Sequence, residues 1–451
     1  MQPIVTPEEM AAIDRDAPEP VEVLIGRAGA AVMRHAIRMM GGTYGRRVVV
    51  VAGKGNNGND GRDAAVRLRG RGVRVDVIDA AWAEGTRLPA ADLVIDAAYG
   101  TGFRGDYHAP DPGGAAVLAV DIPSGVNGRT GEAGDGAVRA DETVCFAALK
   151  PGLVLLPGRE RAGRVHLVDI GLDVSRATAH VIEASDVAQW LPRRPLETHK
   201  WRAALWIVAG SPGMTGAAAL ASRGAQRTGA GYVRLSIPGG SPADATAVPI
   251  EVVRTELPSS AWDGPVLDGL VRFKALVVGP GLGTDPVTIT AVRRVVQEST
   301  VPSVVDGDGL TALGSDVARY AHPLSVLTPH DGEYERLAGH PPVADRIAAA
   351  RDLAASTTAT VLLKGSTTVI ADSDGRVLVS MTGDARLATA GTGDVLSGVI
   401  GSLLAQGVHP LRAAAAGAWL HGMASTLGPR RGLVAGDVAQ HLPAVLDGLE
   451  A

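Results

Sequence analysis

Short apolar runs alternate with segments of helical character along the whole chain, and this rhythm occurs twice. In the first half, the apolar runs cover residues 47–52, 73–78, 93–96, 117–121, 142–147 and 165–169. Apolar strands that alternate with helices are typical of a parallel sheet covered on both faces. The first half therefore predicts such a sheet, with a helix over 61–69 after its first strand.

The second half repeats this pattern after a charged, proline-bearing stretch at 173–198, which includes a short amphipathic segment at 185–191. Such a change in composition is typical of a domain junction. The strands expected beyond it cover 204–209, 231–237, 275–278, 303–306, 325–328, 361–364 and 368–371. The expected helices cover 215–228, 331–338, 346–354 and 394–406. We therefore predict an α/β protein with two domains, at residues 1–195 and 196–451.

Composition argues against several classes of protein. A chain of 451 residues is too long for one ordinary core, which agrees with two domains. The formal charge is −5 without a block of like charges, so we expect neither nucleic acid nor a membrane as a partner. The first residues lack an apolar signal segment, and the single cysteine, Cys145, lies in a strand-like run. We expect a cytoplasmic protein.

Polar loops follow three of the expected strands in the first half. They cover residues 53–61, 96–106 and 121–125. Because the carboxyl ends of parallel strands meet at one edge of a sheet, ligands gather there. The three loops therefore predict one binding crevice.

The first of these loops formally matches the dinucleotide pattern G-x-G-x-x-G from Gly53 to Gly58. It also carries four polar side chains, Asn56, Asn57, Asn59 and Asp60. Such groups suit hydroxyls, amides or a hard cation, whereas a dinucleotide loop presents bare backbone to pyrophosphate. An NAD-dependent oxidoreductase remains an alternative that this loop disfavours.

The run 387–398 places an acid directly after a glycine turn, at an expected helix N-terminus. Backbone N–H groups of 391–394 would face a developing negative charge, while Asp394 takes a proton from an attacking hydroxyl. An ordinary glycine and aspartate helix cap is the alternative. The chain has no Walker A sequence, which argues against a P-loop enzyme.

Together, the segments at 54–61, 96–106, 121–125 and 147–152 resemble the NAD(P)HX epimerase family, which has a Rossmann-like fold. The second half resembles its usual fusion partner, the ADP/ATP-dependent NAD(P)HX dehydratase, which has a ribokinase-like fold. That resemblance rests on motifs at 199–200, 210–217, 227–231, 279–283, 328–333, 364–368 and 391–394. It implies a three-layer αβα architecture in each domain.

The resemblance also implies the reaction. The substrate would be hydrated NADH or NADPH, whose nicotinamide ring carries an added hydroxyl in either of two epimers. One domain would interconvert the R and S epimers, and the other would dehydrate the S epimer to NAD(P)H. ADP, which would give AMP and phosphate, is favoured over ATP as the phosphoryl donor.

By this resemblance, the epimerase substrate binds Asn56, Asn57, Gly58, Asn59, Asp60, Gly100, Thr101, Gly102, Phe103, Arg104, Gly105, Asp106 and Asp121. Asp121 is also the implied catalytic residue, since its charge would stabilise a cationic ring nitrogen as hydroxide leaves and returns. The resemblance further implies a potassium ion at Asn57, Asp96 and Ser124, whose oxygens suit a hard cation. The alternative is that Asp96 and Asp121 only cap neighbouring turns.

In the dehydratase, the resemblance implies that Ala217, Gly281, His330 and Asp394 line the hydrated nicotinamide site. Lys364, Gly365, Ser366, Thr367, Thr368 and Gly393 would bind the adenine nucleotide, with Mg²⁺ between its phosphates. Asp394 would deprotonate the added hydroxyl, which then receives the terminal phosphoryl group and leaves as phosphate. As alternatives, His330 is a structural histidine and 279–283 is only a tight turn.

The expected partners are therefore small molecules, NADHX, NADPHX and ADP, and a further copy of the chain in a homo-oligomer. Two other functions remain open. One is a ribokinase-like small-molecule kinase fused to a Rossmann-like binding domain, which the 391–394 turn would serve equally well. The other is a non-catalytic binding role for the first half.

Overall fold

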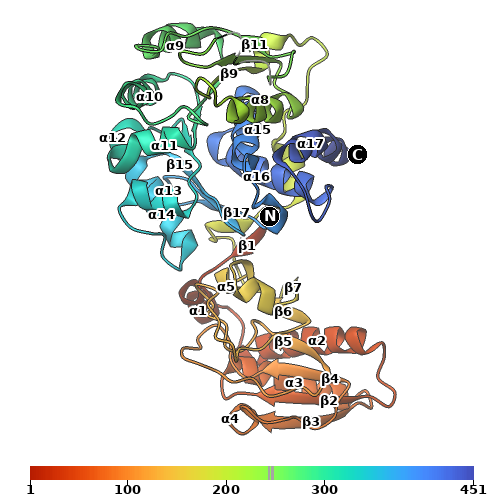
Figure 1. Ribbon diagram of the computed structural model, residues 1–451. Coiled ribbons are helices and arrows are strands. Elements are labelled where there is room, and N and C mark those ends of the chain that lie inside the picture. The colour runs from red at the N-terminus through yellow and green to blue at the C-terminus, as the bar shows by residue number, and fades with distance from the viewer. Residues whose placement is uncertain (242–243, 245–247, 451) are drawn as a thin grey trace. The chain divides into compact units, whose positions relative to one another are not determined.

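The computed structural model describes residues 1–241, 244 and 248–450, which form two compact units (Figure 1). The first unit contains Gln2–Ala179. The second contains His180–Ala451 together with Met1.

The first unit is built on a parallel sheet with the strand order β3-β2-β4-β5-β6-β7. The strands of this sheet are β2 (Arg47–Ala52), β3 (Arg74–Asp79), β4 (Leu93–Ala97), β5 (Ala116–Val120), β6 (Glu142–Phe146) and β7 (Arg164–Val168). The short strand β1 (Gln2–Ile4) is not part of it. The helices of the first unit are α1 (Pro7–Arg15), α2 (Val21–Met40), α3 (Asn56–Arg69), α4 (Ala80–Ala83), α5 (Pro151–Val154) and α6 (Gly158–Arg161). Every strand predicted in the first half is confirmed to within one residue at each end.

Both faces of this sheet are covered, because alternate side chains of a strand point to opposite faces. Helices α2 and α3 lie on one face of the sheet (Figure 1). Val48 and Val50 of β2 belong to the core between these helices and the sheet. Val49 and Val51 belong to a second core under α4 and residues 88–140. The predicted αβα layering is therefore present, with short helical cover on the second face.

The second unit has a mixed sheet whose strands follow the order β8-β17-β16-β15-β14-β13-β12-β9-β10-β11. These strands are β8 (Ala179–Val181), β9 (Ala204–Val208), β10 (Tyr232–Ser236), β11 (Val253–Arg254), β12 (Ala275–Val278), β13 (Ser303–Val305), β14 (Ser325–Leu327), β15 (Thr360–Leu363), β16 (Thr368–Ala371) and β17 (Val377–Ser380). The strands from β9 to β15 pair in parallel, whereas β16 is antiparallel to both of its neighbours.

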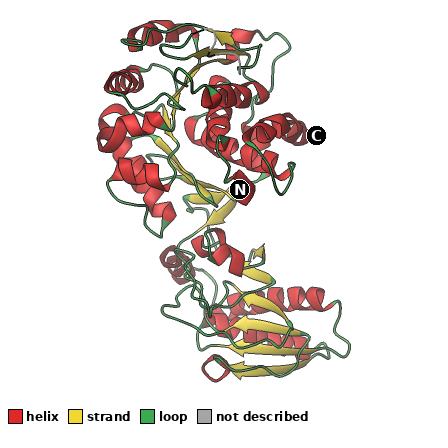
Figure 2. Ribbon diagram, in the orientation of Figure 1, coloured by secondary structure: helices red, strands yellow, loops and turns green. Residues whose placement is uncertain are grey.

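Helices cover both faces of the second sheet (Figures 1 and 2). On one face lie α8 (Gly216–Arg227), α15 (Thr392–Ala405), α16 (Pro410–Thr426) and α17 (Ala435–Glu450), which share one core with alternate residues of the central strands. The opposite side carries α10 (Pro286–Glu298), α11 (Asp308–Leu313), α12 (Val317–Tyr320), α13 (Asp331–Ala338) and α14 (Arg346–Thr357). The remaining helices are α7 (Ala184–Trp190) and α9 (Asp263–Gly269), with 3₁₀ turns at Lys200–Ala203, Leu270–Arg272, Gly314–Asp316 and Ala385–Leu387.

The division between the units lies between residues 179 and 180, earlier than the predicted boundary at 195 and 196. Residues after β8 join the second unit, because the Ile182 N–H donates to the Val379 carbonyl at 3.1 Å. Helix α7 then packs against α16 and α17. Most of the charged stretch that suggested a junction, from residue 180 to residue 198, is therefore part of the second unit.

Helices α8 and α15 make a close approach at Gly398. A Cβ at this position would lie 1.9 Å from the Ala221 carbonyl oxygen. We expect Gly398→Ala to lower the free energy of unfolding of the second unit by about 1–3 kcal/mol or more, because backbone must move. Denaturant unfolding followed through the buried Trp206 and Trp262 measures this.

Gly448 in α17 is the matched control, since no atom of the described residues lies within 4 Å of the place that a Cβ would take there. At this position, Gly→Ala is expected to stabilise the helix by up to about 1 kcal/mol. Equal effects of the two substitutions would contradict the close approach of α8 and α15.

In the described part of the chain, no helix has the length and apolar character needed to cross a membrane.

Candidate active sites

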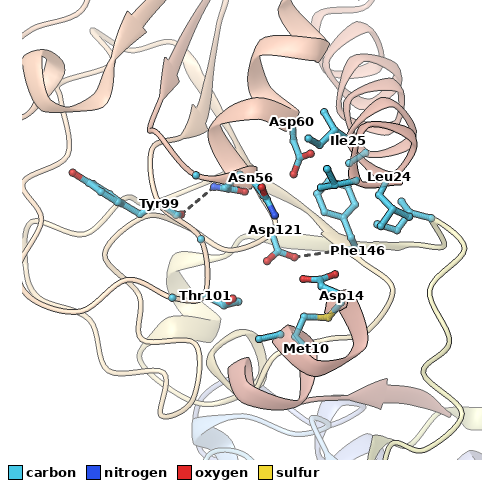
Figure 3. Close-up of a pocket in the computed structure, with 18 of the residues that line it drawn as sticks. Met10, Asp14, Leu24, Ile25, Asn56, Asp60, Tyr99, Thr101, Asp121 and Phe146 are labelled. Atoms are coloured by element: carbon cyan, nitrogen blue, oxygen red, sulfur yellow. Dashed lines mark hydrogen bonds between the residues drawn. The ribbon is translucent and has the colours of Figure 1, made fainter. Parts of the chain in front are cut away.

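The polar loops of the first unit line a cavity of about 900 Å³ at the carboxyl ends of β2, β4 and β5 (Figure 3). The predicted residues that line it are Asn56, Asn57, Asp60, Gly100, Thr101, Gly102, Phe103, Arg104 and Asp121. Residues that were not predicted for this site also line it, among them Met10, Asp14, Leu24, Tyr99, Phe146 and Lys150. Met10 and Asp14 come from α1 and Leu24 from α2. The prediction considered only loops that follow strands of the sheet, so it did not include these helices.

Four predicted residues of the same loops lie outside this cavity lining. Gly58 is buried against the first loop, where a Cβ would come within 2.0 Å of the Gly53 carbonyl oxygen. Asn59 is partly buried on α3. Gly105 and Asp106 line a second cavity of about 490 Å³ together with Gly125.

The three predicted potassium ligands lie together beside the backbone of Tyr99. The Asn57 amide donates to the Tyr99 carbonyl at 3.0 Å, and the Tyr99 N–H donates to Ser124 Oγ at 2.9 Å. Ser124 in turn donates from Oγ and from its backbone N–H to Asp96, at 2.6 Å and 2.8 Å. Burial raises the pKa of the Asp96 carboxyl to about 6, although the bonds from Ser124 oppose this rise.

One oxygen of this cluster is unsatisfied. Oδ1 of Asn57 is buried and has no hydrogen-bond partner among the residues that the structure describes. A buried amide oxygen without a donor is costly unless a cation or water binds it. The oxygen donors present therefore fit a hard monovalent cation.

Asp121 directly follows β5 and has a left-handed backbone conformation, with φ of 64°. The strand predicted at 117–121 therefore ends at Val120, one residue earlier than expected. Its carboxylate forms an ion pair with Lys150, which is only 1% exposed, and accepts the Phe146 N–H at 3.4 Å (Figure 3). The ammonium also donates to the Phe146 carbonyl at 3.2 Å. Burial favours the neutral amine, but the pairing with Asp121 outweighs it and raises the pKa of Lys150.

In the second unit, Gly391 turns the chain into α15 with φ of 88°. A Cβ there would lie 2.4 Å from Leu220, so this left-handed turn requires glycine for space as well as for conformation. The Thr392 hydroxyl donates to the carbonyls of Leu387 and Thr389, at 2.9 Å each. The first N–H groups of α15 have no partner within the helix, which makes this turn suited to an anion.

Asp394 lies in the first turn of α15. Burial raises the pKa of its carboxyl to about 6, and the negative charge of Asp306 adds to the rise, while Lys364 opposes it. Asp394 is therefore a base of moderate strength beside an anion-binding turn.

Close to Asp394 lies a buried charge network centred on Asp306, which directly follows β13. The Asp306 carboxylate accepts hydrogen bonds from Lys364 at 2.9 Å, Thr328 at 2.8 Å and Ser397 at 2.6 Å. Burial opposes its charge, but these three donors hold the pKa of Asp306 below its usual value. Lys364 also pairs with Glu333 at 3.4 Å. Asp306 was not among the predicted site residues.

Of the other predicted residues of the second unit, His330 and Gly393 lie next to this network. Glu333 lies 3.6 Å from His330 Nε2, and a Cβ on Gly393 would lie 3.7 Å from Lys364 Nζ. Residues 365–368 directly follow Lys364 and lead into β16. A Cβ on Gly281 would lie 3.1 Å from that of Ala217, so these two positions adjoin.

His330 also has the structural role that was its alternative. Its Nδ1 accepts the N–H groups of Gly332 and Glu333 at 3.1 and 3.3 Å, and so caps α13. This cap fixes the tautomer, because Nδ1 must be unprotonated to accept. More than half of the His330 side chain is exposed, so the ring remains accessible to a ligand.

Comparison with known proteins agrees with both sites. Residues 205–446 match the sequence model of the NAD(P)H-hydrate dehydratase family, and residues 21–88 and 79–152 match that of the YjeF-related protein N-terminus. The bifunctional NAD(P)H-hydrate repair enzyme Nnr of Moorella thermoacetica is 37% identical, over 99% of this chain and 97% of that relative. The chain belongs to the bifunctional NAD(P)H-hydrate repair enzyme family.

Further relatives extend the comparison. The repair enzyme of the same name from Mycobacterium tuberculosis is 40% identical, over 83% of this chain and 82% of its own length. The solved ADP/ATP-dependent NAD(P)H-hydrate dehydratase from Bacillus subtilis, co-crystallised with ATP and Mg²⁺, is 30% identical with a TM-score of 0.51. It covers 59% of this chain and 97% of its own. The predicted membership of this repair family is therefore confirmed, as are the two α/β domains.

Proposed function

We propose that this chain repairs hydrated NADH and NADPH. The first unit interconverts the R and S epimers of NAD(P)HX, and the second dehydrates the S epimer at the expense of ADP. The observation that carries the proposal is the position of Asp394, a partly buried carboxyl with a raised pKa, beside the anion-binding turn at Gly391. Its support is the family membership over the length of both units.

In the dehydratase reaction, Asp394 accepts the proton of the added ring hydroxyl as the terminal phosphoryl group is transferred to that oxygen. The N–H groups at the start of α15 and the Lys364 ammonium offset the charge that develops on the phosphates. The C–O bond then breaks with phosphate as leaving group, and loss of the neighbouring ring proton gives NAD(P)H. The nucleotide would enter as its Mg²⁺ complex.

Asp306 acts on this reaction through Lys364. The lysine ammonium is a compact charge at the end of a flexible side chain. Other groups must therefore fix its position if it is to contact a phosphate. The bonds from Lys364 to Asp306 and Glu333 hold it, and the bond from Ser397 joins the same carboxylate to α15. Asp306 is thus a positioning residue for the phosphate site.

In the epimerase reaction, the ring nitrogen expels the hydroxyl and becomes a cation, to which water then adds from either face. The carboxylate of Asp121 lines the cavity and would stabilise that cation. Its ion pair with Lys150 holds the carboxylate at the cavity wall.

Asn57, Asp96 and Ser124 would hold a potassium ion, and the unsatisfied Asn57 oxygen supports this. The ion would supply a fixed positive charge beside the cavity. The remaining polar residues of the loops at 53–61 and 96–106 would make the hydrogen bonds that orient the substrate.

Potassium is expected to stabilise the first unit. A ligand at 100 times its dissociation constant adds about 2.7 kcal/mol to the free energy of unfolding. Hydrogen exchange of the β4 and β5 amides should therefore be slower in KCl than in NaCl of equal ionic strength. Asn57→Ala should remove the difference, and Asn59→Ala on the same helix should keep it. An equal exchange rate in both salts would contradict the site.

We infer further that ADP is the preferred phosphoryl donor, that NADHX and NADPHX are both substrates, and that the enzyme is a cytoplasmic homo-oligomer. Incubation of a mixture of both NADHX epimers with ADP, ATP or no nucleotide tests the central proposal. NADH must appear only with nucleotide, and ADP must yield AMP and phosphate in equal amounts. Formation of NADH at the same rate without nucleotide would contradict it.

A further inference from the structure

Asp60 is a buried carboxyl on α3 of the first unit. It is 8% exposed and lines the cavity, into which its side chain points (Figure 3). Within residues 1–241, 244 and 248–450, its carboxyl has no hydrogen bond or ion pair. The buried carboxylates Asp96 and Asp306, by contrast, each accept three donor groups.

Two other carboxyl groups converge on the same space. Asp121 points into it from the end of β5, and Asp14 points into it from α1, on the side of the cavity away from Asp60 (Figure 3). The buried Lys150 ammonium also lines the cavity, but it is already paired with Asp121 and with the Phe146 carbonyl. The three acids therefore share one buried positive charge. Because Asp60 has no cationic partner of its own, it is the most easily protonated of the three.

The remaining surroundings of Asp60 favour its neutral form. Helix α2 contributes apolar side chains, among them Leu24 and Ile25. On α3 itself, Asp63 adds a further negative charge, although it is ion-paired with Arg67. Arg62 is turned away and donates to the carbonyl of Gly53, at 2.6 Å. Burial, followed by the charges of Asp121, Asp63 and Asp14, raises the pKa of Asp60 to about 8, while Lys150 opposes the rise.

A metal ion is not the explanation for this cluster. In the described part of the chain, no group of three or more histidine, cysteine, aspartate or glutamate side chains is arranged to hold one. Lys54 and Arg15 also line the cavity, but both are exposed to solvent. A shared proton therefore accounts for the three neighbouring acids better than a cation does.

We propose that Asp60 is the neutral acid that donates a proton to the departing hydroxyl in the epimerase site, and that Asp14 serves the opposite face of the ring. This proposal rests on the proposed epimerase function and deepens it. It adds to that function the source and the destination of the proton.

The step needs no oxidant or reductant. The ring C–O bond breaks, the Asp60 proton goes to the departing oxygen to form water, and the lone pair of the ring nitrogen forms a C=N double bond. Water then adds to the opposite face, its proton passes to the Asp14 carboxylate, and the C=N bond returns to a single bond. Asp14 is exposed, so its proton returns to solvent, and Asp60 is reprotonated from the open cavity.

The two units allow the proposal to be tested in the intact chain. Starting from the R epimer alone, with nucleotide, the appearance of NADH requires epimerisation as well as dehydration. Starting from the S epimer, it requires only dehydration. We expect Asp60→Asn to lower the first rate, after subtraction of the uncatalysed background, by about 10²–10⁴-fold and to leave the second unchanged. Asp16→Asn, an exposed acid near Asp14 in the sequence, should change neither rate.

The pH dependence separates proton transfer from a structural role. The acid form of Asp60 is required, so the rate from the R epimer should fall as pH rises through about 8, and the rate from the S epimer should not. Asp63→Asn removes a negative charge near Asp60 and should lower the pKa of Asp60. The decrease in rate at alkaline pH (the alkaline limb of the profile) should then occur at lower pH. The thermal midpoint of Asp60→Asn should stay close to that of the parent, because one neutral group replaces another.

Three results would overturn the proposal. One is an Asp60→Asn variant that keeps the parent rate from the R epimer within threefold. Another is a parent rate from the R epimer that shows no alkaline limb. The third is a parent that dehydrates the S epimer but does not accelerate epimerisation, which would remove the epimerase function as well. Absence of dehydration would instead count against the proposed function of the second unit.

Discussion

Replacing Asp394 with asparagine is expected to lower the nucleotide-dependent rate of NADH formation from S-NADHX by about 10²–10⁴-fold, since the amide cannot accept the hydroxyl proton. The raised pKa of about 6 gives a second expectation. The base form is required, so the parent rate should rise as pH increases through about 6 and level off above it. Initial rates of NADH absorbance from purified S-NADHX, measured on both sides of this pKa, test both.

The control for this experiment is Asp447→Asn, which removes an exposed carboxylate from α17 without touching the site. Epimerisation by the first unit should also persist in the Asp394 variant. An Asp394→Asn rate within tenfold of the parent would show that another group takes the proton, and the turn at Gly391 would then serve only to bind phosphate.

Asp121→Asn is expected to destabilise the first unit by about 3–5 kcal/mol, besides abolishing epimerisation, because it leaves the buried Lys150 ammonium without its counter-ion. This effect should appear as faster hydrogen exchange of the β5 and β6 amides in the intact chain. The strands β9 and β12 of the second unit are the internal reference. The loss of activity in this variant alone therefore does not distinguish a catalytic from a structural role.

The double variant Asp121→Asn, Lys150→Met makes that distinction. It removes both charges and restores an apolar fit, so exchange in β5 and β6 should return most of the way to the parent rate. Epimerisation should remain absent, because the carboxylate that stabilises the ring cation is still missing. Full activity in the stabilised double variant would contradict a catalytic role for Asp121.

The strands were predictable because each is short, apolar and followed by polar residues. Long helices were harder. Helix α2 was not among the predicted helices although it is amphipathic, and Gly29 in its middle has a low helix propensity. That glycine is required by packing, since a Cβ there would lie 2.2 Å from the Asp63 carboxylate of α3. Helix α16 is buried on nearly all sides and therefore shows no polar face to mark its period.

The site was predictable where the polar residues follow strands. Asn57 lies at the start of α3, Asp96 lies in β4 and Ser124 follows β5, and the structure brings them together beside Tyr99. Partners from other elements were not predictable in this way. The pairing of Asp121 with Lys150 and that of Lys364 with Asp306 each depend on how separate strand ends pack, and no local pattern in the sequence specifies either contact.

The domain boundary shows the same limit. Proline and charge at 192–195 are typical of a linker, yet α7 and the chain from residue 180 before them belong to the second unit. Strand pairing is a long-range contact, so composition alone does not reveal which sheet a short strand joins.

Recovery of NADH absorbance from a mixture of R- and S-NADHX with ADP, using the parent, Asp60→Asn and Asp394→Asn, tests the repair function most directly. We predict complete recovery by the parent. Asp60→Asn should give rapid recovery limited to the S fraction, and Asp394→Asn should give none. No nucleotide-dependent recovery by the parent would contradict the repair function, and would direct attention to a small-molecule kinase instead.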